Sequence, residues 1–434
     1  MVDVNLSENL KENLPYISAT IQDLNRMNKF LPERSIRIFQ AEILINKNFS
    51  ITSPFTGKAV SPNANYLAPN SGCIYWFQDK EPFCVISSSL RLGNPLQTLF
   101  VLDETVDLVG VNLTEKIFNI AKDFISSEFE PCTFIDEDKD PMLFLGNANF
   151  AHFMWNEFPA LRSIIKTSNT AKVNIFCDPL GVALPFCIKS GVNWRLCSNF
   201  SAERGWHDAS LVLPGSVFCD SESKKEIISL AGVPRIYQSA RGKRAGIAFK
   251  FYATLRKKGR TLENQKEFMT ELVSSFLETY PNSNFILDGF SLPVDFERSI
   301  YDPIRNVFEE RVGREALLIR EVMDEFSEKD KARLYDINGK SLLEAFEVIS
   351  EIDFYVTHAG TMQHKAAWLY PVPGVMHSNS SGMTPSGLKW HGSQVEDTIS
   401  PNGISSELID DLEVKGMPNQ NDRNRDYRIT DVHK

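Results

Sequence analysis

The stretch Val356-Thr357-His358-Ala359-Gly360-Thr361-Met362-Gln363-His364 leads from an apolar run into a turn of small residues. The apolar run, Phe354 to Val356, predicts a buried strand, and Gln363 to Tyr370, closed by Pro371, predicts a helix. The turn would then lie at a helix N-terminus, whose free backbone N–H groups suit a phosphate or another anion. By itself the pattern fits a structural turn as well as a binding loop.

Length and composition indicate a globular protein of several domains. The chain has 434 residues, which exceeds the roughly 250 to 300 residues that one core can organise. Apolar residues make up 42 %, yet no apolar run approaches the ~18 residues of a membrane span. The segment from Met1 to Lys29 lacks the basic start and apolar centre of a secretion signal, so we expect a cytoplasmic protein without a transmembrane segment.

The charge distribution bears on the class of ligand. A formal net charge of −10 argues against nucleic-acid binding, which needs a basic surface. Basic residues nevertheless accumulate between Arg235 and Arg260, with no acidic residue among them. This local concentration fits a small anionic ligand better than a long polyanion.

Residues 1–130 predict an N-terminal α+β extension. A probable helix, Leu10 to Leu31, is followed by short β-like runs such as Ile36 to Ile45 and Leu99 to Val109. No catalytic chemistry is indicated there. This extension can shape an acceptor site, dock to a partner or cover a sheet edge.

Strands and helices alternate from Pro141 onward, which predicts parallel sheets covered by helices. A first series, in a domain at residues 131–235, has its strands at 142–145, 173–176 and 211–213. A second series, in a domain at residues 236–395, has strands predicted at 247–252, 285–287, 317–319 and 354–356. The polar tail, residues 396–434, is expected to be loosely ordered.

The fold class predicted is therefore α/β, with two Rossmann-like doubly wound domains that face each other across a cleft. Ligands of such sheets bind at the carboxyl ends of the strands. The arginines after the Ile247 strand and the histidine after the Phe354 strand would then line one crevice, although about one hundred residues separate them.

A histidine-containing helix follows the first strand of the middle domain. Asn147 or Asn149 can cap it, and His152 and Asn156, four residues apart, share one face. Pro159 should bend the helix or lie near a kink. With Glu157 as a neighbouring carboxylate, His152 can serve as a general base near neutral pH. The alternative is a buried histidine whose ring bonds to a backbone carbonyl.

Two arginines, Arg256 and Arg260, follow the Ile247 strand and precede a helix that Thr261 can cap. Their guanidinium groups can hold a diphosphate and offset the charge that develops as it leaves. The alternative is a solvated basic loop, which is the commoner explanation of such a run.

Together these segments resemble glycosyltransferase family 61. The resemblance covers about residues 140 to 380 and rests on His152 to Leu161, which is similar to the family's His-Trp-aliphatic-x-acid-x-Leu-Pro-Arg-Leu. It rests further on Arg256, Arg260 and Asn264, in the family's Arg-x3-Arg-x3-Asn setting, and on Thr357 to Gly360, where the family has a Gly-x-His-Gly-Ala-Gly type loop.

This resemblance implies the glycosyltransferase B architecture and transfer of a sugar from a nucleotide-sugar donor with inversion, without a metal or another cofactor. It implies a polysaccharide or glycolipid acceptor, which the protein can reach by peripheral contact if the acceptor is membrane-bound. His358, Gly360 and Thr361 would join the two arginines at the donor diphosphate. The chain departs from the family where Asn156 replaces the usual acid and Glu157 is shifted by one residue. Either His152 or Glu157 can then be the base.

Weaker signals favour other sites and functions less. The acidic turn Asp136 to Asp140 has Asp-x-Asp spacing but precedes its strand, so a solvated loop is expected. His358, His364 and His377 lack helical metal-ligand spacing. Two alternatives to a transferase stay open: a nucleotide-sugar epimerase or hydrolase, and a carbohydrate-binding or scaffold protein that has lost catalysis.

Overall fold

The computed structural model describes residues 14–31, 36–68, 72–88, 96–101, 107–109, 119–121, 123–124, 131–145, 149–167, 172–175, 180–191, 193–196, 205–232, 249–255, 261–294, 296, 302–412 and 425–431. The chain divides into two compact units, of which the first holds residues 1–148, 152–179 and 183–219. The second holds residues 149–151, 180–182 and 220–434. Each unit has its own parallel sheet.

The first unit begins with two helices, α2 (Leu14–Met27) and α3 (Ile38–Asn46). The first confirms the predicted N-terminal helix. The second corrects the β-like interpretation of residues 36–45, because Phe39, Gln40 and Ile43 are buried at helical spacing while Ile45 is 77 % exposed. The Gln40 side chain donates to the Leu213 carbonyl at 2.5 Å, which fixes this helix against a later segment of the same unit.

An antiparallel sheet of six strands follows, in the order β11-β3-β4-β5-β6-β7. Its strands are β3 (Ala64–Ala68), β4 (Gly72–Phe77), β5 (Phe83–Ser88), β6 (Leu96–Val101), β7 (Asp107–Val109) and β11 (Gly205–His207), and a small pair is formed by β1 (Ile51–Thr52) and β2 (Ala59–Val60). All six residues of β4 are buried, as in a central strand. The edge strand β11 comes from far along the chain, so the N-terminal extension and the region after it fold as one unit.

The parallel sheet of the first unit has the order β10-β9-β8-β12. Its strands are β8 (Met142–Leu143), β9 (Lys172–Ile175), β10 (Asn193–Leu196) and β12 (Leu211–Val212), and its helices include α6 (Phe158–Thr167) and α7 (Ala183–Lys189). Three of these strands lie where the sequence predicts them, and β10 is an addition. Numbered along the chain the order is 3-2-1-4, which is the start of the Rossmann order.

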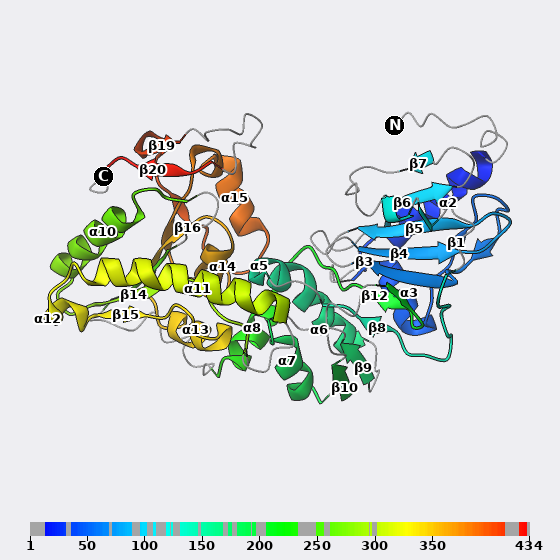
Figure 1. The fold of residues 1–434 in the computed structure, drawn as a ribbon, viewed down its shortest axis with the longest axis horizontal. Helices are drawn as coiled ribbons and strands as arrows, with labels where there is room; N and C mark the ends of the chain where they lie inside the picture. The colour runs from blue at the N-terminus through cyan, green and yellow to red at the C-terminus, as the bar shows by residue number, and fades with distance from the viewer. Residues whose placement is uncertain are drawn as a thin grey trace. The chain divides into compact units, whose positions relative to one another are not determined.

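The second unit contains a parallel sheet of six strands in the order β15-β14-β13-β16-β17-β18. Figure 1 labels β14, β15 and β16 of this sheet. Its strands are β13 (Lys250–Thr254), β14 (Asn284–Asp288), β15 (Leu334–Asp336), β16 (Phe354–His358), β17 (Gly374–His377) and β18 (Asn402–Gly403). Numbered along the chain this order is 3-2-1-4-5-6, the doubly wound order of dinucleotide-binding folds. The α/β class with parallel sheets is thus confirmed.

Helices cover this sheet. They are α8 (Ser221–Leu230), α10 (Gln265–Thr279), α11 (Asp302–Met323), α12 (Glu328–Lys331), α13 (Leu342–Ile349), α14 (Thr361–Ala367) and α15 (Pro385–Ser393). The strand predicted at 317–319 is wrong, because these residues lie in α11, where Leu318, Ile319 and Val322 are buried at helical spacing. The third strand is β15 instead. Ser341 and Glu344 form a capping box at the start of α13.

The described part of the polar tail is folded rather than loose. Besides β18, it forms an antiparallel pair of β19 (Ile409–Asp411) and β20 (Tyr427–Ile429). Tyr427 and Ile429 are buried in the main core of the unit, together with residues of α10, α11, β13 and β14. Composition alone misread this segment, because two alternating apolar side chains are enough to anchor a short strand.

Candidate functional site

The first parallel sheet has its topological switch point between β8 and β12, where ligands of such sheets bind. The segment after β8 carries His152, Asn156 and Glu157, and the segment after β12 carries Ser216. Backbone and side-chain hydrogen bonds join them, since Ser216 N donates to the Asn156 carbonyl at 2.7 Å. The histidine motif therefore belongs to the carboxyl end of the sheet.

A widened helical turn presents the motif. The helix α5 (Phe150–His152) passes into a π-helix, η1 (Phe153–Glu157), and then into α6. Phe158 N–H bonds to the Phe153 carbonyl, five residues back. Such turns occur often at functional sites, and this one lies directly before Pro159, which lacks an N–H for a regular helix bond. The predicted irregularity at Pro159 is confirmed, and so is the cap by Asn149, which accepts from Ala151 N at 3.0 Å.

The hydrogen bonds of Asn156 determine the tautomer of His152. The fully buried Asn156 donates through Nδ2 to the Ser216 carbonyl at 2.7 Å, which directs its Oδ1 to His152 Nδ1 at 3.2 Å. Because an amide oxygen only accepts, Nδ1 of the neutral ring carries the proton and Nε2 carries the lone pair. Half-buried His152 is thus set to accept a proton at Nε2.

Glu157 closes the π-helix and is fully buried. Because Glu157 directly follows Asn156 in the helix, its side chain lies on a different face of the helix from those of His152 and Asn156. The imidazole Nδ1 is oriented by the amide of Asn156, in the position that the sequence prediction gave to a carboxylate. A catalytic role for Glu157 stays a prediction.

The second sheet has its switch point between β13 and β16, which pair in parallel register. Arg256 and Arg260, predicted to lie after the first of these strands, fall outside the described residues. The end of β13 is described, and Thr254 Oγ1 accepts a hydrogen bond from His358 N at 3.2 Å. The two strand ends that the sequence prediction brought to one crevice are therefore neighbours.

The turn after β16 begins α14 as the sequence predicts. Gly360 has φ 121°, a conformation that side chains other than glycine rarely adopt, and α14 starts at Thr361. His358 is only 1 % exposed, and its Nδ1 lies 2.7 Å from the Ala359 carbonyl. The half-buried Gly360 and Thr361 are more accessible than this ring, and Thr361 Oγ1 donates to Asn149 Oδ1 at 3.1 Å.

A buried polar network under α14 escaped the sequence prediction. Lys365 Nζ lies 2.5 Å from Asp288 Oδ2, and the two side chains are 3 % and 0 % exposed. Nζ also donates to the Gly289 carbonyl and to Ser291 Oγ, each at 3.0 Å. Tyr252 donates to the same carboxylate, and burial beside Asp288 holds the pKa of Tyr252 well above its ordinary value. The network ties the helix that begins at Thr361 to the end of β14.

The C-terminal strand β20 contacts the carboxyl end of β17 in the sheet of the second unit. Tyr427 is fully buried, and its hydroxyl lies 2.7 Å from His377 Nδ1, while the His377 ring lies 5.7 Å from that of His358. The Tyr427 backbone bonds to Thr261 and Glu263, which directly follow the segment of the two arginines. Asn264, the third residue of the arginine pattern, exchanges hydrogen bonds with Ile429 at 2.8 and 3.2 Å.

Among the described residues, no three His, Cys, Asp or Glu side chains are grouped to hold a metal ion. The turn Asp136 to Asp140 is exposed, as expected for a solvated loop. No helix in the described ranges is long and apolar enough to cross a bilayer.

The chain matches no family model and no curated protein sequence. Among solved structures it is similar to the E. coli ADP-heptose LPS heptosyltransferase II, with 12 % identity and a TM-score of 0.24 over 56 % of this chain and 72 % of that one. It is also similar to the Methanocaldococcus jannaschii UDP-GlcNAc 2-epimerase, with 11 % identity and a TM-score of 0.23 over 50 % of this chain and 64 % of that one. A trehalose 6-phosphate synthase from Burkholderia multivorans follows, with 11 % identity and a TM-score of 0.21 over 50 % and 47 %. At such scores these neighbours support no conclusion about function. The functional proposal therefore rests on the topology and the residues of the chain itself.

Proposed function

We propose that this protein is an inverting, metal-independent glycosyltransferase that moves a sugar from a nucleotide-sugar donor to a polysaccharide or glycolipid acceptor. The second unit would bind the donor at the switch point between β13 and β16. The first unit would supply the base at the switch point between β8 and β12.

One observation carries the proposal: Asn156 holds His152 in the tautomer with the lone pair on Nε2. A general base needs that state, whereas a structural histidine needs only satisfied hydrogen bonds. The positions of two motifs also support the proposal. The His152 motif follows β8 and the turn at Gly360 follows β16, and each of these strands flanks the switch point of its sheet.

The proposed reaction forms one bond and breaks one. The acceptor hydroxyl attacks the anomeric carbon from the face opposite to the diphosphate, and its proton passes to His152 Nε2. The bond from the anomeric carbon to the diphosphate oxygen breaks, and the nucleoside diphosphate leaves with the electron pair. Arg256, Arg260 and the N–H groups of the Gly360–Thr361 turn would stabilise the charge that develops on it. His358, being buried, would support this turn.

The test is release of the nucleotide from donor sugars in the presence of a chelator: nucleoside diphosphate from UDP-, GDP- and dTDP-sugars, and CMP from CMP-sugars. We expect release that depends on an added polysaccharide or glycolipid acceptor. Release without acceptor would indicate a hydrolase, and conversion of the donor sugar without release would indicate an epimerase. Binding without any turnover would leave the carbohydrate-binding alternative.

A further inference from the structure

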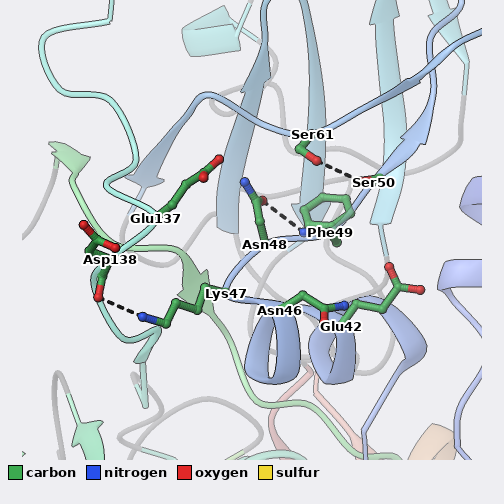
Figure 2. A pocket seen from close by; sticks show the side chains of 9 residues that line it. All are labelled: Glu42, Asn46, Lys47, Asn48, Phe49, Ser50, Ser61, Glu137 and Asp138. Atoms are coloured by element: carbon green, nitrogen blue, oxygen red, sulfur yellow. Dashed lines mark hydrogen bonds between the residues drawn. The ribbon is translucent and has the colours of Figure 1, made fainter.

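A pocket of about 440 Å³ lies in the first unit and has no part in the proposed reaction (Figure 2). Three segments line it: the end of α3 with the loop after it, the residue that follows β2, and the acidic turn before β8. The polar residues Glu42, Asn48, Ser50, Ser61 and Glu137 come from these segments. Segments so far apart in the sequence form a pocket only through the fold.

Hydrogen bonds hold the walls of this pocket in place. Lys47, in a left-handed conformation with φ 63°, turns the chain after α3, and its Nζ donates to the Asp138 carbonyl at 2.8 Å. Ser50 and Ser61 share a hydrogen bond of 2.7 Å, and Asn48 donates to the Pro62 carbonyl at 3.1 Å. The pocket is therefore formed before any ligand arrives, which lowers the entropy cost of binding.

The charges around the pocket select against anions. Glu42, Glu137 and Asp138 contribute three carboxylates, of which Glu42 pairs with the guanidinium of Arg26 at 3.2 Å. The ammonium of Lys47 lies 3.8 Å from Asp140, so the carboxylates of Glu137 and Asp138 leave the lining with a net negative charge. The carboxyl end of α3, with its partial negative charge, faces the same space. A nucleotide or phosphate would be repelled, whereas a ligand rich in hydroxyl donors would be favoured.

We propose that this pocket binds a neutral sugar residue, with Glu137 accepting hydrogen bonds from its hydroxyl groups. Glu137 makes no hydrogen bond or ion pair within the described part of the chain, so its carboxylate oxygens are available as acceptors. The serine hydroxyls both donate and accept, as sugar hydroxyls do. The volume lies within the ~300 to 1,000 Å³ of small-molecule sites. The proposal rests on the proposed function, and the sugar would belong to the acceptor.

The test uses the full chain and saturation-transfer NMR with glucose, galactose, N-acetylglucosamine and maltose, and with spermidine as a cationic probe. Glu137→Gln keeps the size of the side chain and removes its charge. Glu81→Gln is the matched control, because Glu81 is an exposed carboxylate of the same unit outside the pocket. We expect at least one neutral sugar to bind, and Glu137→Gln to weaken this binding by about five- to tenfold while Glu81→Gln leaves it unchanged.

Two results would overturn the proposal: no binding of any neutral sugar, with or without binding of spermidine, or equal sugar affinity in wild type and Glu137→Gln. Binding of the nucleotide-sugar donors is titrated in the same three proteins. Failure of the proposed function shows as absent donor binding in all three, and failure of the pocket shows as absent or unchanged sugar binding, so the two are distinguishable.

Discussion

At the scale of single residues, Asn156 determines what His152 can do. Asn156→Leu removes the hydrogen bonds of the amide to His152 and to the Ser216 carbonyl, so Nδ1 loses the partner that fixes the tautomer. We expect kcat to fall by about 10²-fold with little change in donor affinity, because general-base catalysis contributes roughly that much. Steady-state kinetics and donor titration measure the two effects. Ile165→Ala, which shortens a half-buried side chain of α6, serves as the control for local destabilisation.

An unchanged kcat in Asn156→Leu would contradict this role. A loss of donor affinity equal to the loss of kcat would also contradict it, because such a loss would mean that the substitution disturbs the fold rather than the base.

His377 should make stability depend on pH. Burial lowers its pKa to about 3, against an ordinary value of 6.5, so the folded protein keeps this ring neutral while the unfolded chain takes up a proton. Between pH 6.5 and about 3 the unfolded state thus binds more protons, and stability falls as pH falls, by up to about 1.4 kcal/mol per pH unit.

The measurement is urea unfolding between pH 7 and pH 5 for wild type and for His377→Asn, which cannot titrate there. The variant should lose less stability over this range than wild type, since the carboxylates contribute equally to both. Parallel curves would show that His377 does not titrate in this way.

At the scale of elements, β20 lies beside both segments that we assign to donor binding. Tyr427 contacts His377 at the end of β17 through its hydroxyl, and through its backbone it contacts Thr261 and Glu263, which follow the two arginines. Tyr427→Phe removes only the hydroxyl, and we expect donor affinity to fall by about three- to tenfold as the β17 contact is lost. Arg428→Lys, on the exposed face of the same strand, should leave affinity unchanged. Equal donor titrations for the two variants would assign β20 a structural role alone.

The buried pair of Lys365 and Asp288 should be costly to break. Lys365→Met leaves the carboxylate of Asp288 buried without its ammonium partner, so we expect a loss of about 3 to 5 kcal/mol in the free energy of unfolding. The double variant Lys365→Met with Asp288→Leu should recover most of this loss, because no uncompensated charge remains. Chemical denaturation measures both. A single variant within 1 kcal/mol of wild type would contradict the account.

The sequence predicted long periodic elements well and short apolar runs poorly. The apolar residues of α10, among them Phe268, Val273, Phe276 and Leu277, recur at helical spacing, and Ser341 and Glu344 form a capping box at the start of α13. Each helix thus carries several mutually supporting signals in its sequence. Residues 317–319 contain only three adjacent apolar side chains, which fit a strand or a segment of a long helix equally. Isoleucine-rich α3 has strand-like composition, and tertiary packing, including the contact of Gln40 with Leu213, determines which of its faces is buried.

At the scale of the whole molecule, alternation of strands and helices predicted two parallel sheets but not the assignment of every segment. The switch points follow from strand order, and the His152 motif and the turn after His358 follow strands that flank them. The pair of Lys365 and Asp288 could not be predicted, because the two residues are 77 positions apart and meet only through that order. The addition of β11 to the N-terminal sheet is likewise set by packing rather than by a local pattern.

We propose that the second unit binds a nucleotide sugar without a metal. This binding is tested by calorimetric titration of UDP-, GDP-, CMP- and dTDP-sugars in the presence of a chelator, with wild type, Arg256→Ala and, as the matched control, Lys257→Ala. We predict saturable binding of one nucleotide class by wild type, weakened about 10- to 100-fold in Arg256→Ala and little in Lys257→Ala, since a guanidinium makes two charge-assisted hydrogen bonds to a diphosphate. Absence of binding to every donor, or equal affinities in all three proteins, would contradict it.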